Sequence, residues 1–318
     1  MNVLIYGAGL IGGSIAKALS EKGGHNVYVV NRTQLSYSGI TFVESVELIK
    51  NINFDIICVA TPRGIHYEIY QDVFSKIKNL TTKFIIDCSS VQGQNEYLRG
   101  YFRGKFIPCH PIAGSEKTGF HNSDSNILKG KQCIVIGKNP PQEVLNFWDI
   151  CQMQTNTIDT TQEHDTIYAA VSHIPQLIAF FLPEAREPYT EFYRLKNSSR
   201  IIWEEIFFHN MDRILSILSV HLRLLQMFHE KNLHDGTMIN NGDMIENIIG
   251  NMLYNGNRGH DNIQFAGSGF KTMTMFKDEN SDRLYKSDTS QVMEILENAY
   301  DYLLNIKDKY KISSINIE

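Results

Sequence analysis

The chain has 318 residues, of which 42% are hydrophobic and 20% charged, so it is long enough for two domains of about 100–200 residues each. Its net charge of −5 argues against binding to the phosphate backbone of nucleic acids, and no apolar run approaches the ~18–20 residues of a membrane span. The five cysteines are widely spaced and mostly lie in apolar runs, which favours free thiols in a reducing cytoplasm over disulfides or a metal site.

The first part of the chain alternates β-branched runs with helical stretches. Strands are predicted at Asn2–Tyr6, Asn26–Asn31, Phe54–Ala60, Lys83–Asp87, Lys105–Pro108 and Gln132–Ile136. Helices are predicted at Gly12–Lys22, Gly64–Lys78 and Pro141–Met153. This alternation is typical of the α/β class, so residues 1–158 are expected to form a Rossmann-type domain with a doubly wound, mostly parallel sheet. Because Met1–Gly9 has the pattern of a strand and turn, no signal peptide is expected.

A glycine-rich turn, Gly7-Ala8-Gly9-Leu10-Ile11-Gly12, follows the first predicted strand. Gly7 permits a tight turn, Gly9 lets a pyrophosphate approach the backbone, and Gly12 lets the following helix pack closely on the strand. The free N–H groups at the start of that helix, around Leu10 and Ile11, suit a bound phosphate. The string therefore predicts a dinucleotide site, with a purely structural glycine turn as the alternative.

The end of the second predicted strand bears on the choice of cofactor. An NAD enzyme usually carries Asp or Glu there, to bond the ribose 2′-hydroxyl. This chain has Asn31-Arg32-Thr33, in which Arg32 can pair with a 2′-phosphate and its two neighbours can donate hydrogen bonds. We therefore expect NADP to be preferred over NAD; the alternative is a solvated Arg32 and a site indifferent to the phosphate.

The pattern becomes helical near Thr160, which begins a capping box with Glu163. It continues to about residue 231 with a break near Pro183–Pro188, and it resumes at Ser290–Lys309 after a polar, glycine- and asparagine-rich connection. Ile202–Phe228 is apolar on much of its circumference, which indicates burial by its own domain or by a second subunit. Residues 159–318 are therefore expected to form an all-α domain for substrate binding and dimerisation, with an extended C-terminal tail, in a homodimer.

Three further segments carry a family resemblance. They are Asp87-Cys88-Ser89-Ser90-Val91, His110-Pro111-Ile112-Ala113-Gly114-Ser115-Glu116, and His164-Asp165 followed by Ser172-His173-Ile174-Pro175. In this order, behind the glycine turn and over about residues 1–230, they resemble the prephenate/arogenate dehydrogenase family. The resemblance implies an NAD(P)-dependent oxidative decarboxylation of prephenate or arogenate in tyrosine biosynthesis.

The same resemblance implies roles for the two segments of the first domain. His110 would be the general base that accepts the proton of the substrate's ring hydroxyl as hydride leaves for the nicotinamide, and Ser90 would be its hydrogen-bonding partner. Glu116 matches a family acid that lines or gates the site. Without the motif, His110 would be interpreted as a structural strand-end histidine, Ser90 as a capping serine and Glu116 as a solvated acid.

In the second half, the resemblance implies that Arg194, nine residues before Trp203, binds the ring carboxylate, with Arg200 as its competitor. Trp203 begins the matching helix, and Asp165 matches a second family acid. Gln176 stands where the family has a histidine. Its neutral amide can donate or accept, so it favours relaxed specificity or arogenate over strict use of prephenate.

A second departure from the family lies far downstream. The family's glycine-rich, phenylalanine-containing loop is missing before Arg194, and a similar string occurs at Phe265–Phe270. That segment is either a lid over a site or a plain glycine loop. Two alternative functions stay open: another two-domain reductase, such as an imine or β-hydroxyacid dehydrogenase, and an inactive dinucleotide-binding regulator.

Overall fold

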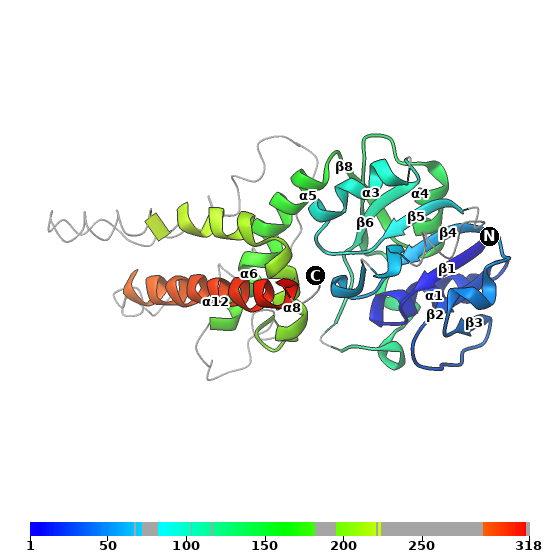
Figure 1. The fold of residues 1–318 in the computed structure, drawn as a ribbon, viewed down its shortest axis with the longest axis horizontal. Coiled ribbons are helices and arrows are strands. Elements are labelled where there is room, and N and C mark those ends of the chain that lie inside the picture. The colour runs from blue at the N-terminus through cyan, green and yellow to red at the C-terminus, as the bar shows by residue number, and fades with distance from the viewer. Residues whose placement is uncertain are drawn as a thin grey trace, which may run out of the picture. The chain divides into compact units, whose positions relative to one another are not determined.

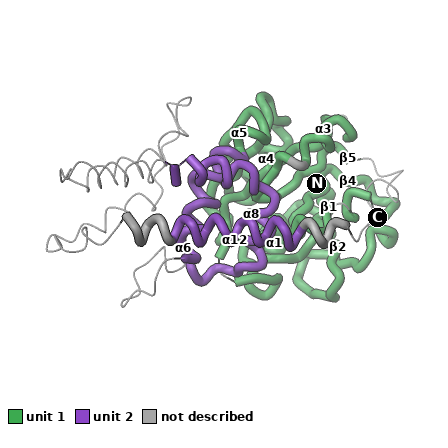
Figure 2. The backbone as a smooth tube through the Cα atoms, turned by 60° about the vertical axis from the view of Figure 1, so that its left-hand side comes forward, with its two compact units in different colours: residues 1–164 green, residues 165–318 purple. Residues whose placement is uncertain are grey.

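A computed structural model describes residues 1–66, 68–71, 82–102, 104–115, 117–181, 195–220, 222–223 and 289–315. The chain divides into two compact units, residues 1–164 and 165–318 (Figure 2). The division falls a few residues beyond the boundary expected after residue 158. The reason is that Thr161 and His164 both bond to residues of the first unit, Glu96 and His110 respectively.

Unit 1 is built on an eight-stranded sheet with the order β3-β2-β1-β4-β5-β6-β7-β8 (Figure 1). The strands are β1 Asn2–Tyr6, β2 Asn26–Val30, β3 Ile40–Val43, β4 Phe54–Val59, β5 Thr82–Asp87, β6 Phe106–Pro111, β7 Gln132–Ile136 and β8 Gln154–Ile158. All neighbouring pairs are parallel except β6 and β7, which are antiparallel. The predicted fold class, a Rossmann-type and mostly parallel sheet followed by a helical region, is confirmed.

All six predicted strands are present, and the structure adds β3 and β8. These two strands form the edges of the sheet. An edge strand buries less of its surface, so its sequence needs no continuous apolar run. In β8, Gln154, Asn156 and Thr157 are exposed, and only Ile158 is buried.

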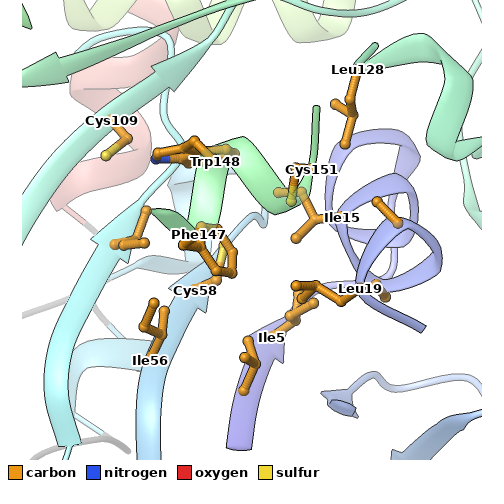
Figure 3. Packing of buried hydrophobic residues seen from close by; sticks show 14 of the residues in the cluster. Ile5, Ile15, Leu19, Ile56, Cys58, Cys109, Leu128, Phe147, Trp148 and Cys151 are labelled. Atoms are coloured by element: carbon orange, nitrogen blue, oxygen red, sulfur yellow. The ribbon is translucent and has the colours of Figure 1, made fainter. Parts of the chain in front are cut away.

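Helices cover both faces of the sheet. The helices of unit 1 are α1 Leu10–Lys22, α3 Glu96–Tyr101 and α4 Gln142–Ile150, with short 3-10 segments η1 Val46–Ile49, η2 Arg63–Ile65, η3 Gly93–Asn95, η4 Phe120–Asn122 and η5 Ser125–Ile127. On one face, Ile15 of α1 and Phe147 of α4 pack toward Ile5 and Ile56 (Figure 3). Leu4 points to the opposite face, because successive strand residues alternate sides. The predicted helix Gly64–Lys78 overlaps η2, and most of its remainder lies outside the described residues.

The chain enters unit 2 within α5, Thr161–Tyr168. Thr160 caps this helix as predicted, since its Oγ1 accepts a hydrogen bond of 3.1 Å from the backbone N–H of Glu163. The further elements are η6 Ala169–His173, α6 Ile174–Phe181, α8 Arg200–His209, a helical stretch at 211–220, and α12 Thr289–Ile315. Side chains of α6, α8 and α12 form one core around Leu177, Phe207 and Leu303. All the secondary-structure elements in the described part of unit 2 are helices.

Three features noted in the sequence lie outside the described residues: the break at Pro183–Pro188, the polar connection after residue 231, and the glycine string Phe265–Phe270. Within the described ranges, no helix is long and apolar enough to cross a membrane.

Candidate active site

The glycine turn lies where β1 ends and α1 begins. Gly7 has a φ of +93°, a backbone conformation that favours glycine. A Cβ there would lie only 2.6 Å from Cγ2 of Thr61. A Cβ on Gly12 would overlap the carbonyl oxygen of Gly7. Backbone conformation and packing therefore account for these two glycines, as expected for a tight turn with the helix close to the strand.

The glycine at position 9 has a different explanation. Its φ of −78° is ordinary for any residue, and a Cβ there would have no protein atom within 4 Å. Neither strain nor packing explains the glycine, whereas close approach by a ligand does. Gly9 is also the N-cap of α1 and makes no side-chain cap bond, so the first N–H groups of the helix, those of Leu10 and Ile11 among them, are available to a phosphate. The turn thus fits a dinucleotide.

Asn31 joins this turn to the end of β2. Its Oδ1 accepts from the backbone N–H of Ala8 at 3.3 Å, and its Nδ2 donates to the carbonyl oxygen of Thr33 at 2.8 Å. One of its two amide hydrogens is therefore already used within the loop. The side chains of Arg32 and Thr33 are exposed. A cationic group thus stands at the position where an NAD enzyme usually has a carboxylate.

A buried carboxylate, Asp87, holds the turn that follows β5. Its Oδ1 accepts from the backbone N–H of Ser89 at 2.8 Å, and its Oδ2 accepts from the hydroxyl of Tyr70. His66 Nδ1 lies 3.2 Å from the same Oδ2, as an ion pair without hydrogen-bond alignment. This turn carries Ser90, whose side chain is partly buried.

The charges of His66 and Asp87 support one another. Burial opposes the ionised form of Asp87, but the charge of His66 and the hydrogen bonds from Ser89 and Tyr70 outweigh it and hold the pKa of Asp87 well below its ordinary value. Burial likewise opposes protonation of His66. The charge of Asp87 and the hydrogen bond of His66 with the backbone oxygen of Thr61 outweigh burial there, so the pKa of His66 is raised. Each charge of the pair therefore favours the ionised form of the other residue.

His110 stands near the carboxyl end of β6 and pairs with a second histidine. Its Nδ1 lies 3.0 Å from Nε2 of His164, and the two rings meet edge to face with their centroids 5.1 Å apart. His164 is fully buried, whereas His110 is partly exposed. No hydrogen bond joins His110 to Ser90 among the described contacts, so the bond that the resemblance implies stays a prediction. Catalytic bonds are often formed only in the complex with substrate.

In unit 2, the helix that carries His173 is locally distorted. Residues Ala169–His173 form a π-helical turn between α5 and α6. Pro175 follows at the second residue of α6 and has no N–H to give to the preceding turn, which accounts for the distortion. His173 is buried in this turn, and its Nδ1 accepts from Nδ2 of Asn210 at 3.0 Å. The same Nδ2 donates to the backbone oxygen of Asp165 at 2.8 Å. Asp165 is fully buried.

The amide of Gln176 has a fixed orientation. The side chain is 1% exposed, and Nε2 donates a 2.6 Å bond to the backbone oxygen of Leu195. Only a donor can face that oxygen, so Oε1 points the other way. Within the described part of the chain, no donor reaches Oε1. The amide is thus not free to flip, contrary to the adaptability expected from the sequence.

Arg200 is exposed, and its contacts lie within unit 2. Its guanidinium carbon lies 4.7 Å from the ring centre of Phe180 and 5.7 Å from that of Tyr302, and Nη2 donates to the backbone oxygen of Phe180. Trp203 packs edge to face on His173, with 6.2 Å between ring centres. Arg194 and Glu116, the other two implied site residues, lie outside the described residues.

Sequence reasoning missed several residues that shape these sites. His164 was noted only as part of a motif, yet it is the partner of His110. Asn210 supports His173, and no motif marks it. The described residues contain no cluster of His, Cys, Asp and Glu suited to a metal ion, and the five cysteines are free thiols.

The comparisons with known proteins agree with this picture. Residues 15–152 match the family model described as "Prephenate dehydrogenase, nucleotide-binding domain". A prephenate dehydrogenase of Lactococcus lactis is 28% identical over 201 residues, which cover 59% of this chain and 55% of that protein. The chain therefore spans little more than half of this curated relative.

Two solved structures share the fold. A prephenate dehydrogenase of Aquifex aeolicus, in complex with hydroxyphenyl propionate and NAD+, is 24% identical, with a TM-score of 0.65, 78% of this chain covered and 94% of that one. An arogenate dehydrogenase of Synechocystis is 17% identical, with a TM-score of 0.62 and 79% and 98% of the two chains covered. At such identities the likeness concerns the fold alone.

The sheet, the glycine turn and the polar groups at the carboxyl ends of β2, β5 and β6 define a dinucleotide-binding domain of the Rossmann type. Residues 15–152 of this unit match the nucleotide-binding domain of the prephenate dehydrogenase family, and the curated relative with the similar sequence is a prephenate dehydrogenase. The resemblance found in the sequence is confirmed.

Proposed function

We propose that the protein is an NAD(P)-dependent dehydrogenase that oxidatively decarboxylates prephenate, arogenate or a close analogue. The observation that carries the proposal is the His110–His164 pair, which lies at the same edge of the sheet as the glycine turn. Ligands of open α/β sheets bind outside the carboxyl ends of the strands, where both features lie. The family match to residues 15–152 adds independent support.

The histidine pair suits a general base in one of its two tautomers. If Nδ1 of His110 donates to Nε2 of His164, the neutral His110 ring keeps an unprotonated Nε2. That nitrogen can accept the proton of the ring hydroxyl while hydride leaves the same carbon. The hydroxyl becomes a ketone, and loss of carbon dioxide then gives a phenol. Ser90, on the turn held by Asp87, is proposed to bond the reacting hydroxyl or His110.

The nicotinamide cofactor supplies the hydride acceptor. Gly7, Gly9 and Gly12 would hold its pyrophosphate, together with the N–H groups of Leu10 and Ile11. We propose NADP as the preferred form. Its 2′-phosphate would be bound by the exposed Arg32 at the end of β2, with Thr33 and the free amide hydrogen of Asn31 as donors.

On the substrate side, we propose that Arg194 binds the ring carboxylate. Its competitor Arg200 already packs on the rings of Phe180 and Tyr302, so these contacts account for its position without a substrate. We propose that Gln176 recognises the substrate's side chain, and that Trp203, Asp165 and Glu116 are further substrate-binding residues. An acceptor at Oε1 suits the ammonium of arogenate better than the carbonyl of prephenate.

The wider setting is also a proposal. We expect a homodimer that acts on a small molecule in the cytoplasm, within tyrosine-type aromatic biosynthesis, without nucleic acid or membrane partners. Ile201, at the start of α8, is 78% exposed, and Ile202 is 46% exposed. Apolar side chains at one helix end suit a contact between subunits.

Absorbance at the reduced-nicotinamide band tests the proposal, with prephenate and arogenate each offered with NAD and NADP. Turnover is expected with at least one combination of substrate and cofactor. Binding of cofactor without turnover would favour the inactive regulator instead. Turnover restricted to hydroxyacids or imines would favour the rival reductase class.

A further inference from the structure

Gln92, directly after the Ser90 turn, makes more contacts than its place in a loop suggests. It is fully buried, and its Nε2 lies 2.8 Å from the backbone oxygen of Ser89 and 3.0 Å from that of Cys109. Longer contacts of 3.3 and 3.4 Å reach Oδ1 and the backbone oxygen of Asp87. An amide nitrogen has two hydrogens, so Ser89 and Cys109 are its principal acceptors.

These two acceptors have a particular place in the chain. Ser89 directly precedes Ser90, and Cys109 directly precedes His110. The parallel pairing of β5 with β6 ends at the Asp87–Pro108 pair. Beyond that pair, β5 has ended while β6 continues and pairs with β7 on its other side. The Gln92 amide therefore bridges the two backbones where the ladder no longer does.

The orientation of this amide is itself fixed. Its Oε1 accepts from Nδ2 of Asn95 at 3.1 Å, and Oδ1 of Asn95 accepts from Nη2 of Arg63 at 3.2 Å. Arg63 also donates to the backbone oxygen of Val91. Both faces of the Gln92 amide are thus satisfied, and a flip would set its oxygen against two carbonyl oxygens. Such a buried, fully bonded group holds its neighbours in one geometry.

We propose that Gln92 is a positioning residue that sets the spacing between Ser90 and His110 for the reaction. The inference rests on the proposed function, because it assigns the geometry of that same site. Gln92 touches neither substrate nor cofactor in this account; it acts through the two backbones. No shorter or charged side chain can donate to both oxygens while accepting from Asn95.

The test compares Gln92→Met with a matched core variant, Val144→Ala. Methionine has a similar volume but no donor, so the carbonyl oxygens of Ser89 and Cys109 lose their bridge. Val144 is fully buried in α4, and its truncation lowers stability without touching the turn. We expect Gln92→Met to lower kcat about ten- to a hundredfold, the scale of a misplacement near 1 Å, while KM for the cofactor changes less than about twofold. Val144→Ala should keep kcat within about twofold.

A second readout needs no turnover. In 15N-histidine spectra of the protein without cofactor, the His110 signal is assigned by its loss in His110→Asn. The pH at the midpoint of its titration is expected to change in Gln92→Met and to stay the same in Val144→Ala. Only the first substitution alters the position of the His110 ring.

The outcomes separate the two proposals. A wild-type protein that turns over none of the substrates would contradict the proposed function. The titration of His110 would still test the positioning role of Gln92. An active wild type whose Gln92→Met variant keeps both kcat and the His110 midpoint would overturn the positioning role. Equal losses of kcat in Gln92→Met and Val144→Ala would also overturn it, by showing a merely structural effect.

Discussion

Nδ1 of His110 lies 3.0 Å from Nε2 of His164, and His164 is completely buried. A buried imidazole that faces another imidazole can accept a hydrogen bond without carrying a charge. The partly exposed ring is thereby oriented with Nε2 directed away from the pair. This relationship gives His110 one property of a general base, a ring held in a fixed orientation.

The choice of cofactor is tested at Arg32. Wild type should bind NADP more tightly than NAD, and Arg32→Ala should reduce the ratio of the two affinities about tenfold or more, because a charge-assisted bond contributes about 1.5–3 kcal/mol. Lys22→Ala, at the other end of α1, is the control and should leave the ratio unchanged. The quantity to measure is Kd for each cofactor by fluorescence titration. A wild type that prefers NAD tenfold would refute this account of Asn31-Arg32-Thr33.

The two candidate arginines should respond differently to truncation. Arg194→Ala should raise KM for the substrate or its Kd at least tenfold with little change in cofactor affinity, since water replaces a guanidinium–carboxylate pair poorly. Arg200→Ala should instead lower the free energy of unfolding by about 1 kcal/mol, because its guanidinium lies over Phe180 and Tyr302. Substrate titrations of both variants measure the loss of substrate affinity, and urea denaturation measures the change in the free energy of unfolding. A larger loss of substrate affinity in Arg200→Ala would give Arg200 the anchoring role.

Substrate preference is expected to follow the amide of Gln176. Leaving Oε1 buried without a donor is unfavourable by about 1–3 kcal/mol, and an ammonium supplies that donor. kcat/KM should therefore be higher for arogenate than for prephenate, by up to about a hundredfold. Gln176→His should shift the ratio toward prephenate, whereas Gln154→His on the exposed β8 should not. An enzyme that used prephenate alone, before and after the change, would show that another residue recognises the side chain.

The His66–Asp87 pair predicts a pH-dependent stability. The pKa of His66 is raised in the folded protein, so its stabilising contribution is fully present below its ordinary pKa of 6.5 and is lost as pH rises through the folded value. Asp87 stays ionised throughout, because its pKa is held below 3.8. His66→Gln should lower the free energy of unfolding by about 1–3 kcal/mol at pH 6 and by less at pH 9. Urea denaturation measures both values, with His121→Gln at an exposed site as control. An equal loss at both pH values would show that His66 is not charged.

Much of this fold could be predicted because local patterns determine it. Apolar runs marked the interior strands, the glycine turn marked the junction of β1 and α1, and Thr160 marked the start of α5. The edge strands β3 and β8 could not be found in the same way, since strands at an edge bury too little surface to need an apolar run.

The site was less accessible to prediction from sequence. Motifs identified His110 and Ser90, but the contacts that orient them join residues distant in the chain, such as His110 with His164 and Gln92 with Cys109. A sequence pattern carries no sign of which buried amide will bridge two strands. The fixed orientation of Gln176 likewise depends on Leu195, whose backbone oxygen no motif marks.

The role of His110 as the base of a prephenate or arogenate dehydrogenase can be measured by single-turnover formation of reduced cofactor. The measurement compares wild type with His110→Asn, each saturated with NADP and mixed with the better substrate. The rate is expected to be about 10²–10⁴-fold lower in the variant, the scale of a lost general base, with Kd for the cofactor unchanged. A variant that forms reduced cofactor at nearly the wild-type rate would contradict it.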